Sequence, residues 1–226
     1  MEFIRTALVV FMKDLRTELR TKEAINASLG FALVMLVLFS FAFDPEAETT
    51  VALSGGLLWI VFAFAGTLIL NRSFARELPN DCLDALIAAP VSGSALFLGK
   101  ALANFVLVMA MELISLPLFG LFYNIRWASQ WPQLLLVMAL GTWGLTVIGT
   151  TFSALTVNIR LREVMLPMLT YPIMIPALVA AMQLTMQLVG GSPISPENMR
   201  WLRLLIGFDV AYTAVALFLV ETVLVG

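Results

Sequence analysis

The segment VALSGGLLWIVFAFAGTLIL, residues Val51–Leu70, contains twenty consecutive residues without a charged side chain. An α-helix rises about 1.5 Å per residue, so a helix of this length spans about 30 Å, the thickness of the hydrocarbon core of a bilayer. The apolar residues follow one another continuously, whereas the strands of a membrane barrel alternate apolar and polar residues. The segment therefore predicts a transmembrane α-helix.

Five more apolar segments of similar length lie on either side of this one. With Val51–Leu70 included, the predicted spans are residues 25–43, 51–70, 101–123, 133–157, 164–189 and 201–224. Only 12% of the 226 residues are charged, while soluble domains carry about 25% charge. We therefore predict an all-α membrane protein in which residues 23–226 form one six-span transmembrane domain. Pro167, Pro172 and Pro176 predict interruptions of the fifth span.

Residues 1–22 form a segment of a different kind. Ile4, Leu8, Leu15 and Leu19 recur at helical spacing, and charged residues occupy many of the other positions. This pattern predicts an amphipathic helix in the inner membrane interface, with its cations toward the headgroups. A cytoplasmic helix that packs on a partner protein is the alternative. Because the segment has no uncharged apolar core, we do not expect a cleavable signal peptide.

The basic residues of the loops are distributed unequally between the two sides of the predicted membrane domain. Ten lie on one side and three on the other. The ten are Arg5, Lys13, Arg16, Arg20, Lys22, Arg72, Arg76, Lys100, Arg160 and Arg162, and the three are Arg126, Arg200 and Arg203. The positive-inside rule then predicts that both termini are cytoplasmic and that Asp44–Thr50 and Gly190–Arg200 are outside.

The sequence lacks the residues that several functions require. It has no His and a single Cys, Cys82, so zinc sites of the usual kind and nucleophiles assisted by His are not available. It has no P-loop or Rossmann glycine pattern, and its net charge of −2 does not favour nucleic acid. We expect a non-catalytic subunit without a metal or cofactor of its own, powered by a partner or by an ion gradient.

Two acidic residues fall inside predicted spans. Glu112 lies near the middle of the third span and Asp209 about a third of the way into the sixth. A charged side chain at such a depth costs about 2.5–3.5 kcal/mol on insertion scales. One interpretation is an internal hydrogen bond to Ser, Thr or Gln, and the other is a path for substrate or protons.

The fourth span is rich in small residues, which let helices approach closely. We expect this span to pack tightly in a bundle or a dimer. The residues are Gly141, Thr142, Gly144, Gly149, Thr150 and Thr151.

The longest predicted cytoplasmic connection, residues 71–100, contains the pattern of a short helix. Asn80 can cap it, and Pro90 ends it because the residue before proline avoids the α conformation. An apolar stripe with acids in the first turn suits a helix that a soluble partner contacts. The predicted contact surface is Glu77, Asp81, Leu83, Asp84, Leu86 and Ile87. Alternatively, the apolar stripe lies against the headgroups or against helix ends of the same chain.

The chain resembles the permeases of ABC exporters and, more narrowly, the CcmB family of the cytochrome c maturation system. Three stretches carry the resemblance: KDLRTELRTKE (Lys13–Glu23), RELPNDCLDALIAAPVSGSALFLGK (Arg76–Lys100) and NIRLREVMLP (Asn158–Pro167). Length and number of spans also agree, so the resemblance covers essentially the whole chain.

The resemblance implies a location in the bacterial inner membrane and a set of partners. In the family, the resemblance implies, the permease forms a homodimer that pairs with the ATPase CcmA, which binds the ATP. It acts beside CcmC and CcmD, which handle haem and load it onto the chaperone CcmE. The absence of His argues against a conventional haem site in this chain, because His is a common axial ligand of haem. The alternatives are a general ABC exporter permease for lipid, polysaccharide or drug, and a gradient-driven secondary transporter.

Overall fold

A computed structural model describes residues 2–43, 48–77, 92–123, 127–157 and 159–225 as helices and their connections, with no strand in these ranges. The α-helices are α1 (Glu2–Thr21), α2 (Glu23–Ala42), α3 (Glu48–Leu70), α5 (Gly93–Phe122), α6 (Trp131–Thr156), α7 (Arg162–Val189) and α8 (Met199–Val225). Short 3₁₀ helices, η1 (Ala75–Glu77) and η3 (Trp127–Gln130), precede α5 and α6 along the chain. Six α-helices, α2 to α8, are long and apolar enough to cross a membrane, which confirms the predicted all-α fold with six spans.

Two features of the helices differ from the predictions: the start of the third span and the continuity of the fifth. The third span, α5, begins at Gly93 rather than near residue 101, because Ser92 caps it by accepting a hydrogen bond from the Ala95 N–H at 3.3 Å. The predicted interruption of the fifth span is wrong, since α7 is continuous from Arg162 to Val189 with its three prolines inside. Prolines are tolerated in membrane helices because neighbouring groups satisfy the freed carbonyls.

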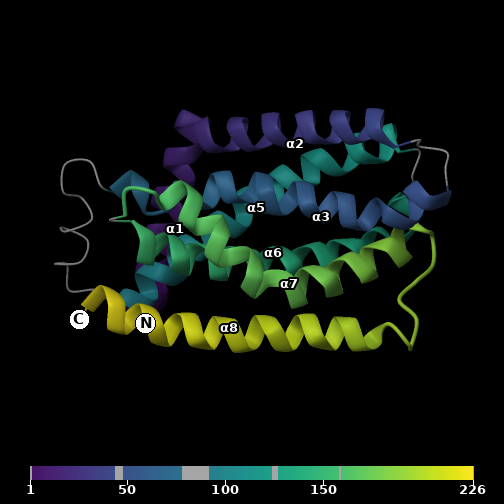
Figure 1. Ribbon diagram of the computed structural model, residues 1–226. Coiled ribbons are helices and arrows are strands. Elements are labelled where there is room, and N and C mark those ends of the chain that lie inside the picture. The colour runs from purple at the N-terminus through teal and green to yellow at the C-terminus, as the bar shows by residue number, and fades with distance from the viewer. Residues whose placement is uncertain (1, 44–47, 78–91, 124–126, 158, 226) are drawn as a thin grey trace.

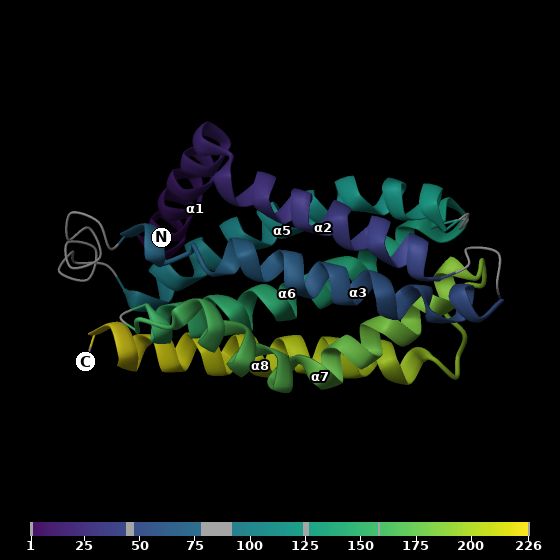
Figure 2. The same cartoon turned by 45° about the horizontal axis from the view of Figure 1, so that its top comes forward.

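The spans form a bundle with α6 near its centre, while α2 and α8 lie on opposite sides (Figures 1 and 2). Trp59 of α3 is fully buried against Gly141 of α6, where an added Cβ would collide with the indole ring. The Trp59 indole N–H donates to Thr185 of α7 at 2.9 Å. Likewise Gly149 of α6 lies against Leu70. The small residues of α6 therefore let this helix pack closely within its own chain.

The first helix, α1, runs across one end of the bundle at a steep angle to the other helices (Figure 2). Both chain ends lie at this end, which we call the terminal end (Figure 1). The chain turns from α1 into α2 at Lys22, whose φ of 56° is left-handed. The apolar side chains Ile4, Leu8 and Leu19 of α1 are exposed, while its other face meets the bundle.

Candidate functional site

Six charged side chains from three elements meet at the terminal end of the bundle, and we call them the anchor cluster. They surround the point where the chain leaves η1 and the point where it re-enters the bundle in α5. The members are Lys13, Asp14 and Glu18 of α1, Arg76 and Glu77 of η1, and Lys100 of α5. The cluster therefore joins α1 to both sides of residues 78–91.

Lys100 is the centre of the anchor cluster. Its side chain is completely buried, and its Nζ donates to Asp14 Oδ2, Glu77 Oε1 and the Ser73 carbonyl, each at 3.0 Å. The same ammonium group lies 5.0 Å from the centroid of the Phe74 ring. A buried ammonium is costly unless it is paired and hydrogen-bonded, and here each of its three N–H donors has an acceptor.

Glu77 lies between two lysines. It contacts the half-exposed Lys13 as well as the buried Lys100. Burial alone would raise the pKa of the Glu77 carboxyl, but Lys100 and Lys13 hold it below its ordinary value of 4.5. Burial would lower the pKa of Lys13, yet Glu77 and Asp14 raise it above its ordinary value of 10.5. Glu77 and Lys13 therefore remain charged around neutral pH.

Glu18 forms the second connection between α1 and η1. Its carboxylate is fully buried and pairs with Arg76, while its other oxygen accepts the Ile25 N–H at 2.9 Å. Ile25 lies in the first turn of α2, where backbone N–H groups lack partners within the helix. Glu18 thus caps α2 and fixes η1 at the same time.

The backbones of α1 and α5 approach each other closely next to the cluster. A Cβ on Gly99 would lie 2.6 Å from the Ala7 carbonyl oxygen and 2.8 Å from the Val10 Cβ. Only glycine leaves room for this contact, because a methyl group would force the helices apart. The residue next to Lys100 in sequence therefore sets the distance across which the cluster forms.

A layer of neutral hydrogen bonds continues from the cluster into the bundle. The Asn104 amide donates to Ser73 Oγ at 2.9 Å and to Thr150 Oγ1 of α6 at 2.8 Å. A small pocket of about 20 Å³ lies beside it, lined in part by Glu18, Arg76 and Asn104. A cavity of this size holds about one water molecule. The cluster is thus connected through α5 to the central helix.

The two intramembrane acids both face α6, from different sides. Glu112 of α5 is fully buried and accepts a hydrogen bond from Thr142 Oγ1 at 2.6 Å. Asp209 of α8 lies beside Gly144, and neither of its oxygens has a partner among the described residues. Residues 142 and 144 are about 200° apart around a helix, so the acids do not share one site. The internal hydrogen bond expected for such acids is present at Glu112.

The predicted contact surface falls mostly outside the described residues. This applies to Asp81, Leu83, Asp84, Leu86 and Ile87, whose role stays a prediction. Glu77 is described, and it turns inward to the two lysines instead of outward.

The acids Asp14 and Glu18 occupy polar positions of the amphipathic pattern in residues 1–22. In the structure Glu18 is buried and Asp14 pairs with Lys100, so both acids face the bundle. The spacing of Asp14 and Glu18, four residues apart, was the available signal that both acids share one helix face. Nothing in the sequence alone pairs them with Lys100 and Arg76.

Comparison with known proteins gives one consistent result. The family model described as CcmB protein matches residues 5–225. A protein of Pseudomonas aeruginosa named heme exporter protein B is 32% identical over 202 residues, which cover 88% of this chain and 87% of the relative. The protein of the same name from Rhodobacter capsulatus is 31% identical over 172 residues, covering 76% of this chain and 78% of the relative. The corresponding Escherichia coli protein is 28% identical over 172 residues.

Proposed function

The chain belongs to the CcmB family, and on this premise we propose that it is the membrane-spanning permease subunit of an ABC-type complex in cytochrome c maturation. Its relatives are named heme exporter proteins, and six of its helices can cross a membrane. We propose that the complex serves haem export or the ATP-driven release of a haem-loaded chaperone.

We propose further that the chain itself is not an enzyme. A separate ATPase subunit of the CcmA type would bind and hydrolyse ATP, and subunits of the CcmC and CcmD types would hold the haem. The sequence supports the assignment of ATP and haem binding to other subunits, because it has no nucleotide-binding glycine pattern and no His to serve as an axial ligand of haem. The chain would lie in the bacterial inner membrane with both termini in the cytoplasm.

The observation that carries this proposal beyond family membership is the anchor cluster. An ATPase that contacts residues 78–91 would move a segment that is flanked on both sides by residues paired with α1. Glu77 and Arg76 bind one side to α1, and Lys100 binds the other. A displacement of the segment would then reach α1, α2 and α5 together. Rigid charged connections of this kind suit a subunit that receives force from outside.

Co-purification tests the proposed contact with the ATPase. Leu86→Asp should still insert into the membrane but lose the ATPase and cytochrome c maturation. Leu121→Asp is a matched control, because this exposed leucine lies at the end of α5 that is far from residues 78–91 in sequence. This variant should keep both the ATPase and cytochrome c maturation. If Leu86→Asp combined with Asp81→Lys retains the ATPase, the contact does not involve this segment, and the basic loop at Arg160 and Arg162 becomes the candidate.

Labelling of single cysteines tests the orientation. In a Cys82→Ser background, Ala47→Cys should react with a membrane-impermeant maleimide added from outside. Ser94→Cys, near the terminal end, should react only after the membrane is opened. Reaction of Ala47→Cys from the cytoplasmic side alone would reverse the proposed topology.

A further inference from the structure

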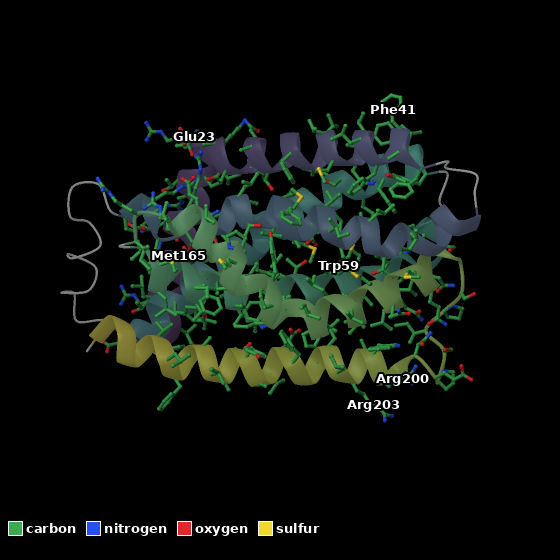
Figure 3. The ribbon with its side chains drawn as sticks, in the orientation of Figure 1. Glu23, Phe41, Trp59, Met165, Arg200 and Arg203 are labelled. Atoms are coloured by element: carbon green, nitrogen blue, oxygen red, sulfur yellow. The ribbon has the colours of Figure 1, made fainter. Side chains whose placement is uncertain are left out.

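A groove of about 620 Å³ opens at the terminal end, between α2, the end of α3 and the start of α7. Its charged lining consists of three arginines and two acids, and its apolar lining includes Ala27 and Leu68. The charged residues are Arg72, Arg76, Arg162, Glu23 and Glu163. Glu23 and Met165, which belong to the two flanking helices, are labelled near this end in Figure 3, whereas Arg200 and Arg203 are at the opposite end.

The three arginines of the groove differ in their availability. Arg76 is held by the buried Glu18. Arg72 pairs with Glu23 at 2.6 Å, but the two side chains are 43% and 67% exposed, and exposed pairs of this kind contribute little stability. Arg162 forms no ion pair with any residue that the structure describes. Two guanidinium groups can therefore turn to an incoming anion.

The groove is charged at one side and apolar along the other. Ala27 and Leu68 belong to the membrane-spanning parts of α2 and α3. On α7, Val164 and Met168 are exposed within two turns of Arg162. The α7 helix also begins here, and its dipole adds positive potential at its N-terminus. A ligand that fits both parts carries a negative headgroup and an aliphatic chain.

We propose that this groove binds an anionic phospholipid, with its phosphate between Arg72 and Arg162 and an acyl chain along Ala27 and Leu68. The planar guanidinium fork matches the geometry of phosphate oxygens, and basic pockets between membrane helices are known binding places for anionic headgroups. A soluble phosphate would satisfy the arginines but would leave the apolar lining without a partner. The proposal does not depend on the transported species.

Native mass spectrometry of the full-length protein tests this proposal. The protein is released from micelles that contain equal amounts of phosphatidylglycerol and phosphatidylcholine with identical acyl chains. The wild type should retain phosphatidylglycerol preferentially. Arg162→Gln should reduce this preference about fivefold, because one cation near an anionic lipid contributes about 1 kcal/mol. Removing both Arg72 and Arg162 should reduce it about 25-fold by the same reasoning.

Two variants separate the loss of charge from other effects. Arg162→Lys keeps the charge and should retain most of the preference, even if the exact fork geometry is lost. Arg203→Gln removes an exposed arginine at the opposite end of the bundle and should leave the preference unchanged. Soluble glycerol phosphate in large excess should not displace the lipid, because it lacks the acyl chain.

Three results would overturn the proposal. They are equal retention of both lipids by the wild type, an equal loss of preference in Arg203→Gln and Arg162→Gln, and displacement of the lipid by glycerol phosphate. The last result would show that the groove recognises a free phosphate group instead of a lipid.

Discussion

Replacing Lys100 by Met isolates the energetic role of burial in the anchor cluster. Met has a similar length, with a sulfur in place of one methylene, and lacks the ammonium group that donates to Asp14, Glu77 and the Ser73 carbonyl. Removing one partner of a buried ion pair costs about 3–5 kcal/mol in unfolding free energy. We expect a value near the lower limit, because Lys13 still contacts both carboxylates after the substitution.

Lys13→Met is the matched control for this experiment. Lys13 pairs with the same Asp14 and Glu77, but its side chain is 41% exposed, whereas that of Lys100 is fully buried. Exposed ion pairs contribute about 0–1 kcal/mol, so Lys13→Met should cost less than about 1 kcal/mol. The two variants thus remove ammonium groups that pair with the same two carboxylates, one from an exposed position and one from a buried position.

The assay is reversible unfolding of the purified protein in mixed micelles, followed by circular dichroism. A double-mutant cycle between Lys100→Met and Glu77→Gln should give an interaction free energy of about 1–3 kcal/mol. Equal costs for Lys100→Met and Lys13→Met, or a cycle without interaction, would refute the reasoning, because burial would then not determine the strength of the cluster.

Further expectations concern the interior of the bundle and the titration of the cluster. Gly141→Val should lower the unfolding temperature strongly, because a side chain there meets the Trp59 ring, and Trp59→Ala in the same chain should restore part of the loss. Glu112→Gln should be tolerated, because its amide oxygen can still accept the Thr142 hydrogen bond; loss of cytochrome c maturation at normal expression would instead favour a proton path. Because the pKa of Glu77 is below its ordinary value, its stabilising contribution should be complete above about pH 4.5 and be lost as the pH falls further. Below that pH, the unfolding free energy should fall more steeply in the wild type than in Glu77→Gln.

The membrane spans could be predicted from the sequence because hydrophobicity is a local property. Val51–Leu70 has no charge at all, and its helix ends at the predicted residue. The start of α5 was missed because eight residues before the predicted span look like part of a loop. Ser92 and the contact of Gly99 with α1 stabilise them as helix, and the second of these depends on a segment far away in the chain.

The anchor cluster could not be predicted for a related reason. An amphipathic pattern identifies the two faces of a helix, but it does not say which face meets the rest of the protein. The apolar face of α1, with Ile4 and Leu8, is exposed, whereas Glu18 is buried. Charges usually mark a solvated face, yet here Asp14 and Glu18 pair with Lys100 and Arg76, so two acids lie on the inner face together with Ala7 and Val10.

The separation of Asp14 and Lys100 in the chain has a consequence for biosynthesis. The two partners are 86 residues apart, and a bacterial ribosome adds about 5–20 residues per second. Asp14 therefore leaves the ribosome about 4–17 s before its buried lysine partner does. During this interval α1 must remain outside the bundle, solvated by water or headgroups, while α2 and α3 insert. The helix α1 is thus made well before α5, yet it cannot reach its final position until Lys100 has left the ribosome.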